Sequence, residues 1–208
     1  MQLVFDFGAV LFSWRPADIL AEVFPEQAPN PQAATQLAHA VFGHADWHDF
    51  DQGLLTEGEV AERISTRLGL PRAITADLVA SIGQRLHPIA PMVQLLQTLK
   101  QRRDAQQGVQ GIYYLSNMPL PYARYLEQAH DFLRWFDGGI FSADVQRIKP
   151  DPAIYQALEQ RYCLQPPCIV FVDDLKPNVL AAQQQGWRAI HFQSAGQLVQ
   201  ELGPLLGT

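Results

Sequence analysis

The sequence has little cysteine, little lysine and no excess of basic charge. Its two cysteines, Cys163 and Cys168, are too few for a disulfide framework. We expect both to be buried thiols of a protein in a reducing cytoplasm. Lysine and arginine total 15 against 21 aspartates and glutamates, a formal net charge of −6. This balance excludes the basic surface on which nucleic-acid binding depends.

Long apolar runs are also absent. No uncharged stretch approaches the roughly 20 residues of a membrane span, so we expect no membrane partner. The apolar stretch 1–12 contains Asp6 and lacks a basic leader, unlike a signal peptide. We therefore expect a cytoplasmic protein. A hydrophobic content of 48% excludes general disorder and is enough for one large domain, or for a core domain with a smaller insertion. The oligomeric state has no signature in the sequence.

Short apolar runs and helical patterns alternate along most of the chain. Strands buried on both faces are predicted at 2–7, 111–115, 139–142, 168–172 and 188–192. Helices are predicted at 91–103, 152–162 and 177–185, each with proline at its first position. This alternation predicts an α/β fold with a Rossmann-like open parallel sheet of about five strands and helices on both faces.

One long segment, residues 15–87, contains no strand-like run. Helices are predicted there at 16–24, 31–42, 57–68 and 73–86, and Thr56 with Glu59 forms a capping-box pattern. The segment is far longer than a crossover between two strands requires. We therefore predict an inserted α-helical cap domain at 15–87 and an α/β core domain made of 1–14 and 88–208.

Polar residues follow three of the predicted strands at their carboxyl ends. Asp6 ends the first strand, Ser116 and Asn117 end the second, and Asp173 and Asp174 end the fourth. Ligands of open parallel sheets bind at that edge. If the fourth strand lies beside the first, the carboxylates meet there and repel one another unless a cation or protons intervene. Any single one of these residues could simply cap a helix, but together they favour a site for Mg²⁺, which prefers oxygen ligands.

Lysine is rare enough for its positions to be informative. Of the three lysines, Lys100 and Lys176 are interpreted as ordinary surface residues. Lys149 lies in the loop RIKPDPAIY, where a compact ammonium group can act on a phosphate.

Four motifs in a fixed order carry a resemblance to a known family. The strings VFDFGAV, YLSN, RIKPDPAIY and VFVDDLKPN together resemble the haloacid dehalogenase (HAD) superfamily over the whole chain, and 15–87 matches its helical cap. FDFGAV, FDQGLLTEGE and KPDPAIY look most like bacterial sugar phosphatases of the alpha-D-glucose-1-phosphate phosphatase branch. The resemblance implies a Mg²⁺-dependent phosphatase that hydrolyses a small phosphorylated metabolite, such as a sugar 1-phosphate, through an aspartyl-phosphate intermediate.

The resemblance also implies roles for the residues that match the motifs. Asp6 would be the nucleophile, and Lys149 would neutralise the charge on Asp6 and on the phosphate. Ser116 and the backbone of Asn117 would donate hydrogen bonds to the phosphoryl oxygens.

The metal ligands implied by the resemblance come from the first and fourth motifs. Asp6, the carbonyl of Gly8 and Asp173 would hold Mg²⁺. Asp174 would be a further ligand or would orient a metal-bound water.

Gly8 departs from the family pattern, because most phosphatases of the superfamily carry a second aspartate there as general acid and base. Its simplest interpretation is a sharp turn after the strand. A general acid contributes about 10²–10⁴-fold in rate, so we expect a slower enzyme that prefers leaving groups needing little protonation, such as an anomeric hydroxyl. Another carboxylate, or water on the metal, could supply the proton instead.

Three residues of the predicted cap, Trp47, His48 and Asp51, face the active site by resemblance and could contact a sugar, although cap packing explains them equally well. His44 and His48 stand four apart, a metal-compatible spacing. Because no third ligand accompanies them, a helix face is the simpler interpretation. Trp14 is predicted at the hinge.

Two other functions stay open at this point. A 2-haloacid dehalogenase also lacks the second aspartate but uses no metal, whereas the Asp173–Asp174 pair calls for a cation. A catalytically weak binding or regulatory protein on the same fold is favoured by Gly8 alone and opposed by the intact Asp6, Lys149 and Asp173.

Overall fold

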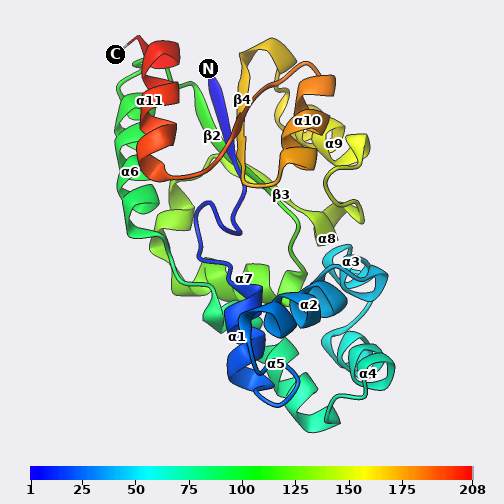
Figure 1. The fold of residues 1–208 in the computed structure, drawn as a ribbon. Helices are drawn as coiled ribbons and strands as arrows, with labels where there is room; N and C mark the ends of the chain where they lie inside the picture. The colour runs from blue at the N-terminus through cyan, green and yellow to red at the C-terminus, as the bar shows by residue number, and fades with distance from the viewer. Residues whose placement is uncertain (208) are drawn as a thin grey trace.

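The computed structural model describes residues 1–207. Its centre is a five-stranded parallel sheet with the order β3-β2-β1-β4-β5 (Figure 1). The strands are β1 (Gln2–Phe5), β2 (Gly111–Ser116), β3 (Gly138–Phe141), β4 (Ile169–Asp173) and β5 (Arg188–His191). The predicted Rossmann-like α/β fold is confirmed. Because β1 lies between β2 and β4, the strands that lead into Asp6, Ser116 and Asp173 are neighbours.

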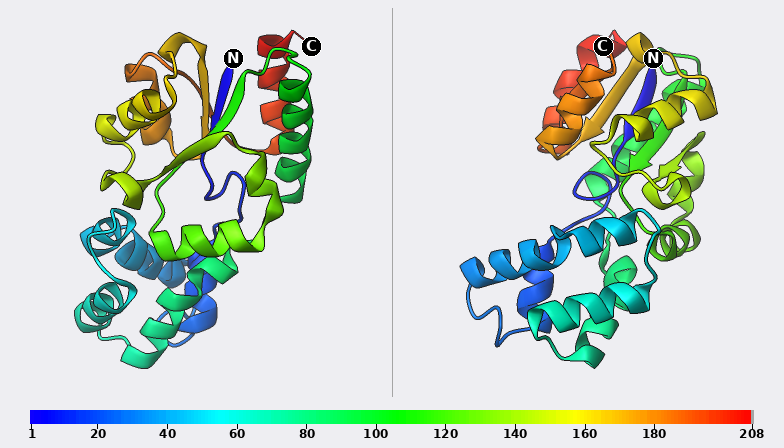
Figure 2. Two further views of the ribbon diagram at one scale, coloured as in Figure 1. Left: turned by 180° about the vertical axis from the view of Figure 1, so that it is seen from behind. Right: turned by 90° about the vertical axis from the view of Figure 1, so that its right-hand side faces the viewer.

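Helices cover both faces of the sheet (Figures 1 and 2). One face carries α6 (Ala90–Asp104) and α11 (Ala195–Leu206), and the other carries α9 (Pro152–Tyr162) and α10 (Lys176–Gln184). Side chains alternate between the faces, as in any strand. Val4 and Phe171 pack on the α9 and α10 side with Trp187, whereas Leu3 and Phe5 belong to the larger cluster on the opposite side.

Five helices lie together beyond the carboxyl ends of the strands (Figures 1 and 2). They are α1 (Pro16–Val23), α2 (Pro31–Phe42), α3 (Ala45–Asp51), α4 (Glu57–Leu68) and α5 (Arg72–Arg85). The capping box of Thr56 and Glu59 is present at the start of α4. The apolar core continues from the sheet into these helices, and their treatment as a separate cap domain stays a prediction.

The chain leaves the sheet for these helices and returns along two adjacent segments. The Ser13 N–H donates to the carbonyl of His87 at 2.7 Å, and the Ile89 N–H donates to the carbonyl of Leu11 at 2.8 Å. Between them, Phe12 pairs with Pro88 as an antiparallel bridge. The two crossings therefore form one hydrogen-bonded connection.

The remaining helices occupy the loops after the strands. They are α7 (Leu120–Ala129), α8 (Ser142–Val145) and the short 3₁₀ turns η1 (Asp131–Trp135) and η2 (Pro166–Cys168). Helix α7 packs against α5, and the Tyr122 hydroxyl donates to the carbonyl of Val79 at 2.7 Å. No helix in residues 1–207 is both long and apolar enough to cross a bilayer.

The expectation of buried thiols is wrong, because both cysteines are exposed. Cys163 is the left-handed C-cap residue of α9, and Cys168 lies in the turn before β4. Both positions are at the surface, where the chain changes direction.

Candidate active site

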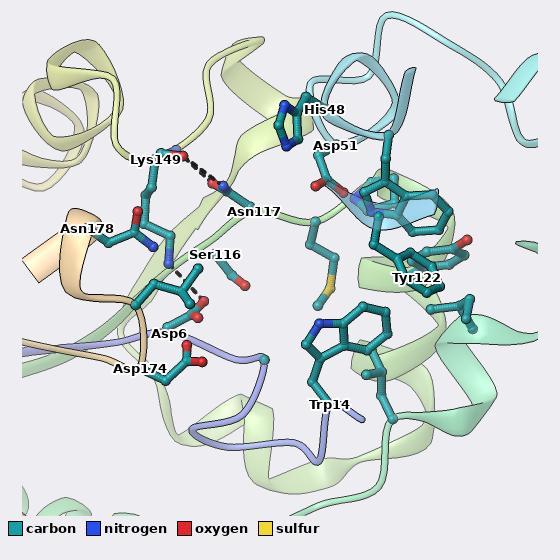
Figure 3. Close-up of a pocket in the computed structure, with 18 residues that line it drawn as sticks. Asp6, Trp14, His48, Asp51, Ser116, Asn117, Tyr122, Lys149, Asp174 and Asn178 are labelled. Carbon is teal, nitrogen blue, oxygen red and sulfur yellow. Dashed lines mark hydrogen bonds and ion pairs between the residues drawn. The ribbon is translucent and has the colours of Figure 1, made fainter. Parts of the chain in front are cut away.

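A lysine and two carboxylates form the buried centre of the site. Asp6 directly follows β1, and its N–H donates to the carbonyl of Val172 at 2.9 Å, which extends the pairing with β4. The Lys149 Nζ lies 2.9 Å from Asp6 Oδ1 (Figure 3) and 2.6 Å from Asp173 Oδ2. The side chain of Lys149 is only 1% exposed. The lysine therefore bridges the ends of two adjacent strands.

Asp173 is held in place by several donors. Besides Lys149, its carboxylate accepts from the side-chain amide of Asn178 at 3.0 and 3.1 Å and from the N–H of Leu175 at 2.8 Å. Such a network fixes the carboxylate in one orientation.

The electrostatics of this centre favour extra positive charge. Burial lowers the pKa of Lys149, but the charges of Asp173 and Asp6 outweigh it and the pKa is raised overall. Burial raises the pKa of Asp6 despite the attraction of Lys149, and Asp173 raises it further. Burial, with the charges of Asp6 and Asp173, raises the pKa of Asp174 to about 7. One ammonium group is therefore too little for three neighbouring carboxylates.

These carboxylates can hold a divalent cation. One oxygen each from Asp6, Asp173 and Asp174 lies within 4.8 Å of the others. Hard oxygen ligands and an excess of negative charge are what Mg²⁺ requires. Gly8 lines the same pocket as Asp6 and Asp174. The donor set therefore fits the predicted metal site.

Asn117 and Ser116 support the charged centre from the end of β2. The Asn117 Oδ1 accepts from the Lys149 N–H at 2.7 Å, and its Nδ2 donates to the Lys149 carbonyl at 3.0 Å. Ser116 is 1% exposed, and its hydrogen bond to Asp6 lowers the pKa of that carboxyl against the stronger effect of burial. The clamp on Lys149 by the Asn117 side chain was not predicted, because its partners are 32 residues apart.

A pocket of about 260 Å³ opens above this centre. Its opposite side is a surface that we call the apolar wall, composed of Trp14, Phe42, Trp47, Ile82, Leu86 and Tyr122. Three of its rings are in edge contact, with centroid distances of 5.0 Å for Trp14–Phe42 and 4.6 Å for Phe42–Trp47. The pocket thus joins a charged floor to an aromatic wall (Figure 3).

The structure places all three predicted cap residues, Trp47, His48 and Asp51, on this pocket. Trp47 is 5% exposed and packs within the wall. His44 does not share a helix face with His48, because it is the N-cap of α3 and its Nδ1 accepts from the Asp46 N–H at 3.1 Å. Trp14, predicted at the hinge, also lines the pocket.

The interpretation of Gly8 as a turn glycine is wrong. The positive φ after β1 belongs to Ala9, at 54°, and not to Gly8. A Cβ added to Gly8 would meet only the Cβ of Trp14, at 4.0 Å. Neither the backbone nor the surrounding space therefore requires glycine at this position.

Comparisons with known proteins agree with this geometry. A family described as haloacid dehalogenase-like hydrolase matches residues 9–186. The chain is 28% identical to a sesquiterpene phosphatase of Aspergillus oryzae, over 98% of this chain and 95% of that protein.

Solved structures show the same fold. A HAD-family enzyme from Bacteroides thetaiotaomicron, solved with magnesium and inorganic phosphate, has a TM-score of 0.67 and 20% identity over 94% of each chain. The L-2-haloacid dehalogenase of Xanthobacter autotrophicus has a TM-score of 0.68 and 20% identity over 97% of this chain and 81% of that one. With the family match extending over most of its length, the chain belongs to the haloacid dehalogenase-like hydrolases.

Proposed function

We propose that the protein is a Mg²⁺-dependent phosphatase that hydrolyses a phosphate monoester through an aspartyl-phosphate on Asp6. The observation that carries the proposal is the cluster of three carboxylates around Lys149 at the floor of the pocket. A phosphate dianion would be repelled from this floor by the excess negative charge. A divalent cation held by the three carboxylates would offset this repulsion, because it would neutralise part of the negative charge of the floor and attract the phosphate.

Each residue at the floor then has a distinct task. Asp6 attacks phosphorus through one carboxylate oxygen while Lys149 holds the other, and Asn117 fixes the backbone of Lys149. The hydroxyl of Ser116 and the N–H of Asn117 would donate to phosphoryl oxygens. Asp6, Asp173, Asp174 and the Gly8 carbonyl would hold Mg²⁺, which supplies positive charge for the phosphoryl group.

The apolar wall limits which alcohol of a phosphate ester the pocket can bind well. A sugar 1-phosphate stays the prediction from the sequence resemblance, and each sugar hydroxyl buried in the pocket needs a polar partner. The helices of residues 16–85 offer only His48 and Asp51 as polar pocket residues. The Tyr122 hydroxyl is already bonded to Val79. Aromatic surface instead favours an apolar alcohol, and we propose an isoprenoid-type phosphate monoester, in keeping with the relative that is a sesquiterpene phosphatase.

A phosphate-release assay tests the proposal. Farnesyl phosphate, para-nitrophenyl phosphate and glucose 1-phosphate are compared with Mg²⁺ and with EDTA, for the parent and Asp6→Asn. We expect Mg²⁺-dependent release that Asp6→Asn abolishes, with kcat/KM higher for farnesyl phosphate than for glucose 1-phosphate. A higher kcat/KM for glucose 1-phosphate would instead favour a sugar phosphate as the substrate. Undiminished turnover by Asp6→Asn would remove the nucleophile assignment.

The same samples separate the alternative functions. Halide release from a 2-haloacid in EDTA would identify a dehalogenase. The absence of turnover of every ester by the parent, together with tight binding of one of them, would identify a binding protein.

A further inference from the structure

Asp51 carries the third carboxyl group that lines the pocket, beside those of Asp6 and Asp174. Asp51, the last residue of α3, is 9% exposed and lines the pocket with Asp6 and Lys149. Within residues 1–207 its carboxylate forms no hydrogen bond and no ion pair. Figure 3 shows this carboxylate pointing from α3 into the pocket, toward the side on which Asp6, Ser116 and Asn117 lie. A mostly buried carboxyl without a protein partner is costly to ionise, and this one is free to interact with a molecule in the pocket.

The backbone of Asp51 is anchored to the sheet. The Ser142 hydroxyl, at the start of α8, donates to the Asp51 carbonyl and accepts from the Met118 N–H at 2.8 Å. Met118 belongs to the loop that follows Ser116 at the end of β2. Asp51 is therefore linked through Ser142 to the loop that forms part of the pocket floor.

The next turn fixes this anchor further. Gly53 has a φ of 71°, and a Cβ there would lie 3.1 Å from the Cβ of Ala143 in α8. Only a residue without a side chain allows so close an approach with this backbone. The turn that follows α3 is therefore in close contact with α8.

The surroundings of Asp51 favour its protonated form. Burial, followed by the charge of Asp6, raises the pKa of Asp51 to about 8, and Lys149 lowers it only in part. Tyr122 faces Asp51 from α7, and His48 lies on α3, the helix that also carries Asp51. On α4, the guanidinium of Arg63 is paired with Asp46 and Asp49.

We propose that Asp51 is the general acid and base of the reaction, acting in place of the carboxylate that the family usually carries at Gly8. The proposal depends on the phosphatase function proposed above. It explains how a chain with glycine at that position can hydrolyse esters of ordinary alcohols.

The proton transfers balance over two steps. Asp6 attacks phosphorus, the bond from phosphorus to the alcohol oxygen breaks, and that oxygen takes its proton from the Asp51 carboxyl group. Asp51, now a carboxylate, then takes a proton from the water that attacks the aspartyl-phosphate. The bond from phosphorus to Asp6 breaks and its electron pair returns to Asp6. The products are the alcohol and phosphate, and Asp51 is protonated again.

The test compares leaving groups that differ in their need for a proton. In Asp51→Asn, kcat/KM for an alkyl phosphate such as farnesyl phosphate should fall by about 10²–10⁴-fold. Turnover of para-nitrophenyl phosphate should change far less, since nitrophenolate leaves without a proton. For the parent, the rate with the alkyl phosphate should decline at alkaline pH as Asp51 ionises, and this decline should be absent in the variant. Asp49→Asn, a change of the same charge on the same helix outside the pocket, is the matched control and should keep both activities.

The outcomes separate this inference from the proposed function. Equal losses for the two esters in Asp51→Asn, or no loss for either, would overturn the role of Asp51 while the phosphatase stands. If Asp6→Asn retains full activity, the proposed function itself fails. Turnover of para-nitrophenyl phosphate by Asp51→Asn shows that the variant is folded, so a selective loss is not due to misfolding.

Discussion

Lys149→Met is the substitution that tests the charged centre most directly. Methionine is close to lysine in volume and keeps the apolar stem packed, but it removes the ammonium group that lies 2.9 Å from Asp6 and 2.6 Å from Asp173. The two carboxylates then face each other in a buried position without a counter-charge. Removing one partner from a buried ion pair destabilises a protein by about 3–5 kcal/mol. We expect a loss of that size in the free energy of unfolding at neutral pH, measured by urea denaturation in EDTA.

The loss should depend on pH and on metal. Without Lys149, the pKa of Asp6 in the folded state rises further above its value in the unfolded state, because Lys149 is the charge that lowers it. Asp6 can then take up a proton, so the destabilisation is largest at alkaline pH and shrinks as the pH falls toward 5. Mg²⁺ should stabilise Lys149→Met more than the parent, because the cation replaces the missing charge.

Lys176→Met is the matched control, since Lys176 is exposed at the start of α10. Surface substitutions of this kind change stability by only about 0.5 kcal/mol or less. If Lys149→Met and Lys176→Met have the same free energy of unfolding at every pH, the floor of the pocket does not have the excess negative charge on which the metal site depends.

Two further substitutions test the surroundings of Asp51. Ser142→Ala should lower the free energy of unfolding by about 1–3 kcal/mol, because it leaves the Asp51 carbonyl and the Met118 N–H without their buried partner. Urea denaturation measures this loss, and an unchanged midpoint would contradict the bridging role of Ser142. In the parent, the raised pKa of Asp51 should make the free energy of unfolding fall as the pH rises from the ordinary carboxyl range toward about 8, because ionisation is easier in the unfolded state. Asp51→Asn removes this carboxyl group, so its free energy of unfolding should fall less over the same range. The difference from the parent should approach about 1.4 kcal/mol per pH unit in EDTA, and parallel pH profiles would show that Asp51 is already ionised in the fold.

The sheet and its charged edge could be predicted because both depend on local patterns. Apolar runs marked the strands, and the polar residues that end them marked the side of the sheet where Asp6 and Asp173 meet. Helix α3 was missed because it is only seven residues long, too short for a periodic pattern to show. Helices α7 and α11 were not assigned either.

Contacts between distant parts of the chain could not be predicted. The link from Ser142 to Asp51 joins residues that are 91 positions apart, and no local pattern of sequence signals such a contact. The interpretation of Gly8 failed for a similar reason. Only the fold shows that the positive φ falls on Ala9 and that Gly8 has free space beside it.

The pairing of Ser13 with His87 brings the two ends of a long helical excursion to a single point of attachment. The strands before and after it, β1 and β2, are direct neighbours in the sheet. In the reaction proposed above, most of the apolar wall comes from residues 14–86 and the phosphate-binding groups come from the sheet, while the proton donor Asp51 comes from α3. In the proposed reaction, the segment between Ser13 and His87 therefore supplies both the surface that meets the alcohol and the acid that protonates it, so a transplanted segment would need a carboxyl group at the position of Asp51.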